Sequence, residues 1–75
     1  MRPRHEVQNQ LRARRMAADL TQQELADRVG VTRQTILSIE KGRYSPTIGL
    51  ALRLAHTLGV AVEELFILEE EFDES

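Results

Sequence analysis

Apolar residues recur at three- and four-residue steps along much of the chain, which is the spacing of amphipathic helices. In the segment 22–29, Leu25, Ala26 and Val29 fall on one side of such a helix. In the segment 33–41, Ile36 and Ile39 share one side in the same way. The pattern predicts two short helices in succession, each with one face turned toward a core.

Residues that begin and end helices flank both segments. Thr21 and Glu24 have the Ser/Thr-x-x-Glu spacing of a capping box, so the first helix is expected to begin directly after Thr21. Gly30 can adopt positive φ and end that helix, and Thr32 is placed to cap the second. Gly42 is expected to stop the second helix. The sequence therefore predicts a helix, a tight glycine-containing turn and a helix.

The outward side of the second helix is polar. It carries Arg33, Gln34, Leu37, Ser38 and Lys41, and no carboxylate. Amides, hydroxyls and cations are the groups that bind base edges and phosphates. An ordinary helical hairpin would show the same periodicity and the same caps. The polar side favours the other interpretation, a bihelical DNA-binding unit whose second helix enters the major groove.

A further helix is predicted before this pair, from residue 6 or 7 to residue 17 or 18, because Val7, Leu11 and Arg15 share one face. An arginine on an apolar face needs a partner. Glu40 lies four residues after Ile36 and therefore also faces the protein. We predict a charge pair between Arg15 and Glu40, for which the planar guanidinium is well suited.

Two more helices are predicted after the pair. Pro46 disfavours helix just before it, and Thr47 is placed to cap a helix over residues 48–58. The residues expected to face inward there are Ile48, Ala51, Leu54 or Ala55, and Leu58. A short fifth helix is expected near Leu65 and Phe66. The fold class predicted from the pattern is all-α, in one small domain of five helices.

Charge is distributed unevenly along the 75 residues. From Glu63 onward there are seven acids and no base, out of twelve acids in the whole chain. The preceding residues hold the other five acids and all ten bases, a net charge of +5, although the whole chain has −2. Phosphate attraction is screened within about 8 to 10 Å at ordinary salt, so an acidic end need not cancel a distant basic face.

Composition narrows the function classes. The chain has no Cys, and His5 and His56 stand apart from any ligand cluster, so no metal and no cofactor are expected. No paired carboxylates, nucleophile with a base, or Gly-rich phosphate loop has a usable spacing, and an enzyme is disfavoured. No apolar run approaches a membrane span. We expect a cytoplasmic protein associated with the nucleoid, with no membrane partner.

The sequence also resembles a known family. The similarity rests on the runs ELADRVGVTRQTILSIEKGRYSP and ALRLAHTLGVAVEELF, which are residues 24–46 and 51–66. The Leu-Ala pair, the turn glycine, the Ile-x-x-Ile-Glu-x-Gly helix end and the terminal Glu-Leu-Phe resemble the Cro and lambda-repressor type of helix-turn-helix regulator, the XRE family. The resemblance implies a compact five-helix lambda-repressor-like DNA-binding domain and a transcriptional regulator, with repression as the simpler mechanism.

The resemblance assigns base contacts to Arg33, Gln34 and Ser38, with Leu37 adjacent. Gln34 can pair with adenine, and Arg33 with guanine or with a phosphate. Leu37 departs from the polar residue usual at its position, and either contacts a thymine methyl or is a tolerated exposed leucine. The resemblance also implies that Arg15 and Glu40 form a structural salt bridge.

Backbone contacts are expected around both ends of the second helix. The resemblance assigns a phosphate contact to Gln22, at a helix start whose free backbone donors suit an anion. Thr32 and Thr35 are divided between capping and phosphate bonding, and Tyr44 has no decidable role. A basic, hydroxyl-rich loop adds phosphate contacts from Lys41, Arg43 and Ser45. Ala61 replaces the family's usual capping serine.

The chain ends are expected to differ from the domain between them. We expect residues 1–5 to form a flexible N-terminal arm, residues 6–66 to form the DNA-binding domain, and residues 67–75 to form an acidic C-terminal tail. A homodimer on double-stranded DNA is expected, with the tail as a candidate dimer contact. The tail could instead fold back on the core or stay disordered. The main alternative function is an antitoxin-like interaction module whose acidic tail binds a protein partner.

Overall fold

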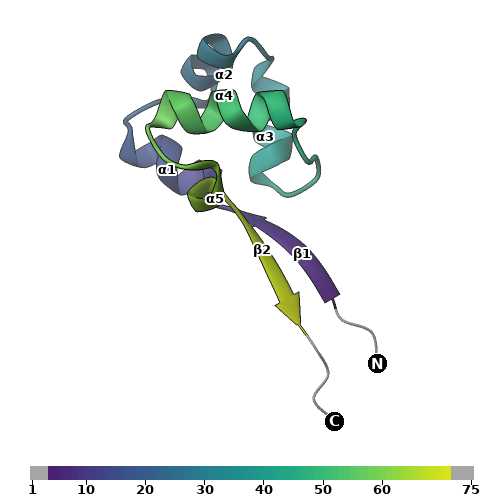
Figure 1. The fold of residues 1–75 in the computed structure, drawn as a ribbon. Coiled ribbons are helices and arrows are strands. Elements are labelled where there is room, and N and C mark those ends of the chain that lie inside the picture. Colours follow the sequence, from purple (N-terminus) through teal and green to yellow (C-terminus); the bar gives the residue numbers. More distant parts are fainter. Residues whose placement is uncertain (1–3, 72–75) are drawn as a thin grey trace.

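A computed structural model describes residues 4–71 and contains the five predicted helices together with a small sheet. The helices are α1 (Leu11–Ala17), α2 (Gln22–Val29), α3 (Arg33–Glu40), α4 (Ile48–Leu58) and α5 (Val62–Leu65). The strands are β1 (Arg4–Asn9) and β2 (Phe66–Glu71), which pair antiparallel. Figure 1 shows the helices gathered at one end, with the two strands projecting from them as a ribbon.

Local capping sets the starts of α2, α3 and α4 as predicted. The backbone N–H of Glu24 donates to Thr21 Oγ1 at 3.0 Å, and the backbone N–H of Thr21 donates to Glu24 Oε1 at 2.8 Å, which completes the capping box. Thr32 caps α3 and Thr47 caps α4, each by a side-chain hydroxyl oxygen that accepts one hydrogen bond from a backbone N–H of the first turn. Gly30 ends α2 with a φ of 77°, a left-handed conformation that favours glycine.

Ten apolar residues from all five helices form the core. No polar or charged residue is buried in the part of the chain that the structure describes. The core residues are Leu11, Leu25, Ala26, Val29, Ile36, Ile39, Leu50, Leu54, Ala55 and Leu65. Since α2 and α3 contribute half of these side chains, the core fixes their mutual orientation and leaves the other side of α3 exposed.

The predicted start of the first helix was wrong. Residues 6–9 belong to strand β1, and α1 begins only at Leu11. Val7, which was expected on the inward face of a helix, is 58% exposed on the ribbon. The side-chain amide of Asn9 donates to the carbonyl of Ile39 at 2.9 Å, so a contact distant in sequence holds the end of the strand against α3. Long-range pairing therefore overrides a local helical spacing here.

Residues 66–71 form a strand that pairs within the same chain. β2 pairs with β1 in a register that sets Val7 opposite Leu68 and Asn9 opposite Phe66. The expected flexible arm and acidic tail are therefore joined in one ribbon where they are described. Residues 1–3 of the arm and 72–75 of the tail lie outside the described residues.

The inward face of α4 also differs from the prediction at its first residue. Ile48 is 80% exposed, whereas Leu50 is buried together with Leu54 one turn later. Because Thr47 caps the helix, Ile48 lies in its first turn, on the side away from Leu50 and Leu54. None of the described helices is both long and apolar enough to cross a membrane.

Candidate nucleic-acid interface

The four residues expected to contact bases lie together on the outer side of α3. Arg33 and Gln34 are exposed, and Leu37 and Ser38 are half-buried. The Gln34 side-chain amide donates to Ser38 Oγ at 3.4 Å, a weak contact between neighbours one turn apart. On the other side of the same helix, Ile36 and Ile39 are fully buried in the core. The helix is thus fixed on one side and presents polar groups on the other.

The start of α3 combines capping with exposed hydroxyl groups. Thr32 Oγ1 accepts a hydrogen bond from the backbone N–H of Thr35 at 3.3 Å, and the two hydroxyl oxygens are 3.1 Å apart. Thr32 is exposed and Thr35 is half-buried. A hydroxyl has one proton to donate and two acceptor sites, so capping leaves each threonine able to make a further bond.

A chain of polar side chains joins three helices behind the outer side of α3. Arg33 Nε donates to Gln22 Oε1 at 3.3 Å, and Gln22 Nε2 donates to Glu40 Oε1 at 3.2 Å. Arg15 Nε donates to Glu40 Oε2 at 2.7 Å, and Arg15 Nη2 donates to Glu40 Oε1 at 3.3 Å. These hydrogen bonds link the start of α2 to both ends of α3 and to α1.

The pair predicted between Arg15 and Glu40 is thus close and nearly bidentate. Its side chains are only 11% and 4% exposed, respectively. Arg15 Nη1 also donates to the carbonyl of Leu20 at 2.8 Å. Such a pair adds little net stability relative to apolar residues, but the loss of one partner leaves the other charge desolvated and alone. The pair therefore fixes where the end of α3 meets α1.

Sequence reasoning missed the bridging position of Gln22. It treated the residue as a phosphate contact only, whereas the side chain lies between Arg33 and Glu40. No periodicity signals such a bridge, because it depends on the angle between α2 and α3. The only indication in the sequence was that α2 begins with a polar residue, Gln22, while the carboxylate of Glu40 must face inward and needs partners.

The loop after α3 presents the predicted backbone contacts. Lys41, Arg43 and Ser45 are all exposed. The backbone N–H of Arg43 donates to the carbonyl of Ser38 at 2.9 Å, and this bond ties the loop to the last turn of α3. Two cations and a hydroxyl therefore lie directly beyond the outer side of the helix.

Tyr44, whose role the sequence left undecided, belongs to the same surface. A hollow of about 210 Å³ is lined by Gln34, Thr35, Ser38 and Tyr44. Tyr44 is 44% exposed, and it is not among the partly buried residues that pack against the core. A phenolic hydroxyl can donate a hydrogen bond and accept one, so this residue adds a polar group beside Gln34 and Ser38.

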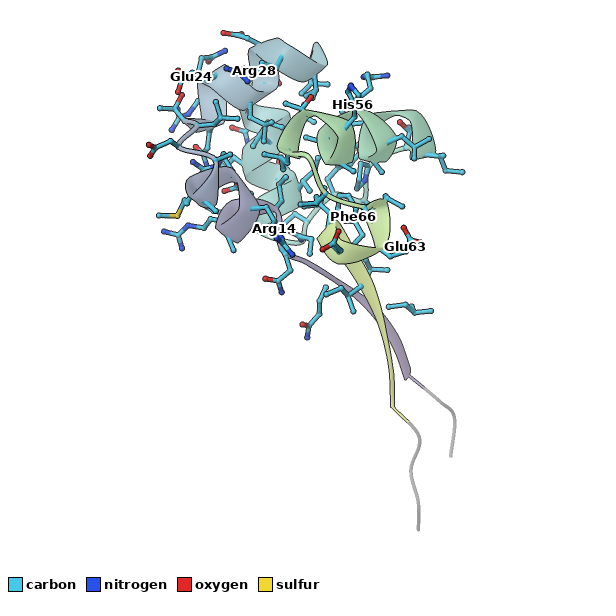
Figure 2. All side chains as sticks on the ribbon, turned by 60° about the vertical axis from the view of Figure 1, so that its left-hand side comes forward. Arg14, Glu24, Arg28, His56, Glu63 and Phe66 are labelled. Atoms are coloured by element: carbon cyan, nitrogen blue, oxygen red, sulfur yellow. The ribbon has the colours of Figure 1, made fainter. Side chains whose placement is uncertain are left out.

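Glu63, Glu64 and the backbone of residues 69–71 lie apart from this surface. In Figure 1, β2 runs outward from the helices, which carries the backbone of residues 69–71 to the far end of the ribbon. Figure 2 shows Phe66 at the base of the ribbon, with Glu63 nearby on α5. Glu64 Oε2 lies 3.5 Å from Arg14 Nη2 across α1 and α5. The net positive charge of the helical part is therefore not cancelled locally at α3.

His56 lies on α4, as Figure 2 shows, and is exposed. Within residues 4–71, no three His, Cys, Asp or Glu side chains are grouped so that they could hold a metal ion.

A family model and several known proteins are similar in sequence to this chain. The helix-turn-helix family model matches residues 11–65. The chain is 56% identical over 62 residues to a helix-turn-helix-type transcriptional regulator of Methanothermobacter thermautotrophicus, covering 81% of this chain and 90% of that one. It is 39% identical over 57 residues to the cryptic phage CTXphi transcriptional repressor RstR of Vibrio cholerae, covering 76% of this chain and 51% of the repressor.

Among solved structures, the chain is similar to the restriction-modification controller protein C.AhdI of Aeromonas hydrophila. The TM-score is 0.71 at 33% identity, and the match covers 76% of this chain and 86% of the controller. The match to the family model begins at Leu11 and ends at Leu65, so it covers the five helices and excludes both strands of the ribbon.

Proposed function

This chain belongs to the helix-turn-helix family of DNA-binding transcriptional regulators, of the Cro and lambda-repressor type, and we propose that it represses transcription by occupying a promoter. The observation that supports this proposal is the outer side of α3, where Arg33, Gln34 and Ser38 are presented above a buried isoleucine pair. A relative of this chain, RstR, is a transcriptional repressor. Repression needs only occupancy, so one small domain suffices for it.

In this proposal α3 enters the major groove of double-stranded DNA. The amide of Gln34 can bond adenine N6 and N7 at once, and Arg33 can bond guanine O6 and N7. Each such pair discriminates against a wrong base by about 1 to 3 kcal/mol. Ser38 can bond either kind of base edge, and Leu37 can contact a thymine methyl. In the free protein Arg33 is held by Gln22, which orients its guanidinium before DNA arrives.

Phosphates on either side of the groove would be bound by the groups that surround α3. The proposed backbone contacts are Gln22, Thr32, Thr35, Lys41, Arg43 and Ser45. These residues are exposed or half-buried around both ends of α3, where they can reach the phosphates of the two DNA strands that border the groove. Phosphate contacts fix the register of the protein, and α3 then selects the sequence.

We further propose that the regulator acts as a homodimer at the chromosome in the cytoplasm, without a cofactor and without catalysis. One unit reads only a few base pairs, and a two-fold dimer on half-sites about 34 to 36 Å apart is the usual way to lengthen the site. The antitoxin-like alternative has less support, because residues 67–71 of the tail are paired with β1 of the same chain.

A salt titration of DNA binding tests the proposal. Gel shifts on a selected site should give log affinity falling steeply with log salt, by about 0.9 for each phosphate neutralised. Lys41→Ala and Arg43→Ala should each reduce that slope by about 1 per subunit. Arg28→Ala is the matched control, because Arg28 lines a different hollow together with Leu52 and His56. Absence of any salt-dependent shift would refute the proposal.

A further inference from the structure

The ribbon leaves one edge of each strand free. The sheet has only two strands in the order β1-β2, so within residues 4–71 each strand has a single neighbour. Figures 1 and 2 show the helices at one end of the ribbon and not along its edges. A two-stranded ribbon is at best marginally stable in water, and a free edge presents unpaired backbone donors and acceptors. The ribbon therefore has the backbone groups to accept another strand.

Apolar side chains on the ribbon are also uncovered. Val7 and Leu68 are directly opposite in the register and are 58% and 59% exposed. Because side chains alternate along a strand, both lie on the same face, and Ile67, which is also exposed, lies on the other. The helical core covers none of these three side chains. A strand added at the free edge of β1 would cover Val7, whereas Ile67 and Leu68 on β2 would keep their present exposure.

Charge distinguishes the two edges. The segment Phe66–Glu71 has the sequence FILEEE, with three acids and no base, whereas Arg4–Asn9 has the sequence RHEVQN, with one acid and one arginine. Two copies of β2 placed side by side would set six carboxylates on two adjacent strands, whereas two copies of β1 in the middle of a sheet would keep the two acidic strands apart. Two copies of β1 would gather equal numbers of Arg and Glu, and like charges on adjacent strands are destabilising. β1 also has no Pro or Lys, which commonly protect an edge from pairing.

We propose that the free edge of β1 binds β1 of a second copy of this chain. The result would be a four-stranded antiparallel sheet in the order β2-β1-β1-β2. Such an interface is the same patch on both subunits, so the dimer is closed, whereas β1 against β2 of another copy is a head-to-tail contact that forms a larger ring or an open filament. This inference rests on the proposed function, because it supplies the interface of the proposed homodimer.

Paired lysine substitutions test which edge is used. Val7→Lys should raise the dimer dissociation constant roughly a hundredfold, because it removes buried apolar area twice and sets two cations on adjacent strands. Leu68→Lys is the matched control of equal exposure on β2, and it should change the constant by less than about threefold, a small fraction of the burial energy of one leucine. Sedimentation equilibrium measures both. An equal loss in both variants, a loss in Leu68→Lys alone, or no loss in either overturns the proposal.

Disulfide trapping gives an answer that does not depend on a destabilised variant. The chain contains no Cys, so single cysteines can be placed one at a time at positions 5 to 8 and at positions 67 to 70. Opposed residues on paired strands have Cβ atoms about 4.5 to 5.5 Å apart, close to disulfide geometry. Oxidation should yield covalent dimers from the first set, with a maximum at one position. Dimers from the second set alone, or from neither set, would contradict the proposal.

DNA binding separates this inference from the function on which it rests. Val7→Lys should bind a single half-site as well as the unaltered chain does, and a full two-fold site about tenfold or more weakly. An unaltered chain that dimerises through β1 but binds no DNA would overturn the function and leave the interface standing. An unaltered chain that binds two-fold sites while all β1 variants behave like it would overturn the interface alone.

Discussion

The helical body and the ribbon are stabilised by different interactions. The body buries ten apolar side chains, and threonines cap three of its helices. Among the ribbon positions whose burial the structure describes, 7–9 and 66–68, no side chain is buried. The ribbon depends instead on backbone pairing between the two ends of the chain. The body therefore has a core of its own, whereas a two-stranded ribbon of this kind depends on its attachment to the body.

That attachment is made by a few bonds at the base of the ribbon. The Asn9 side chain donates to the Ile39 carbonyl at 2.9 Å, and the backbone N–H of Gln10 donates to the Leu65 carbonyl at 2.8 Å. Both acceptors belong to buried core residues. The core therefore positions the first residues of the ribbon, and the rest of the ribbon extends beyond it.

The largest effect is expected from Glu40→Ala, inside the body. The substitution leaves the nearly buried Arg15 guanidinium without its carboxylate, which is expected to cost about 3 to 5 kcal/mol. Thermal unfolding should shift downward by at least about 10 °C, and DNA affinity should fall because Gln22 and Arg33 lose their anchor. Glu63→Ala, at an exposed acid of α5, is the control. An unchanged melting curve for Glu40→Ala would show that the pair does not hold α3.

A pair of leucine truncations contrasts the two regions directly. Leu54→Ala in the core should cost about 2 to 5 kcal/mol, because a cavity replaces a fully buried side chain. Leu68→Ala on the ribbon should cost less than about 1 kcal/mol in a monomer, because the side chain already faces water. Urea unfolding of both variants measures the difference. Equal losses would mean that the ribbon shares the cooperative core.

The sequence predicted the body well because its signals are local. Capping threonines, helix-ending glycines and apolar spacing act within about one turn, so α2 and α3 were bounded correctly. It failed for the ribbon because β1 and β2 lie at opposite ends of the chain. Val7 also happens to stand four residues before Leu11, at a helical step. Ile48 was misjudged because a first-turn residue can share the spacing of a core face and still be exposed.

In the candidate site, too, the sequence predicted the features that depend on local spacing and missed those that depend on tertiary packing. The grouping of Gln34, Leu37 and Ser38 on one side of α3 follows from helical spacing, and a charge pair for Glu40 follows from the inward side. The place of Gln22 between two charged groups, and of Tyr44 beside the Gln34 hollow, depends on how helices and loop pack. Such tertiary relations leave no periodic trace in the sequence.

A smaller effect is expected where the body meets the ribbon. α5 begins after Ala61, whose backbone N–H donates to Glu64 Oε1 at 2.8 Å, but alanine has no oxygen to return the bond. Ala61→Ser should complete the capping box and stabilise the chain by about 1 kcal/mol in thermal unfolding. Ala61→Val, which adds no oxygen, serves as the control. No gain from serine over valine would show that this helix start does not limit stability.

The smallest effect concerns the cap of α2. The carboxylate of Glu24 accepts a bond from the backbone N–H of Thr21, which lowers the pKa of Glu24 below its ordinary value of 4.5. A group whose pKa is lowered by folding adds stability above its unfolded pKa and loses it as pH falls through the folded pKa. Stability should therefore decline slightly below pH 4.5. Glu24→Gln should lack this part of the acid decline. An identical loss of stability at low pH in both proteins would contradict this role of the Glu24 carboxylate.

The most direct test of the account is the DNA sequence that the protein selects. Sites should be selected from random duplexes by the unaltered chain and by Gln34→Ala. We expect a two-fold site and, for the variant, lost preference for adenine at one position in each half, worth about 1 to 3 kcal/mol, with unfolding unchanged. Identical preferences from the two proteins, at equal affinity, would contradict the claim that the outer side of α3 reads the bases.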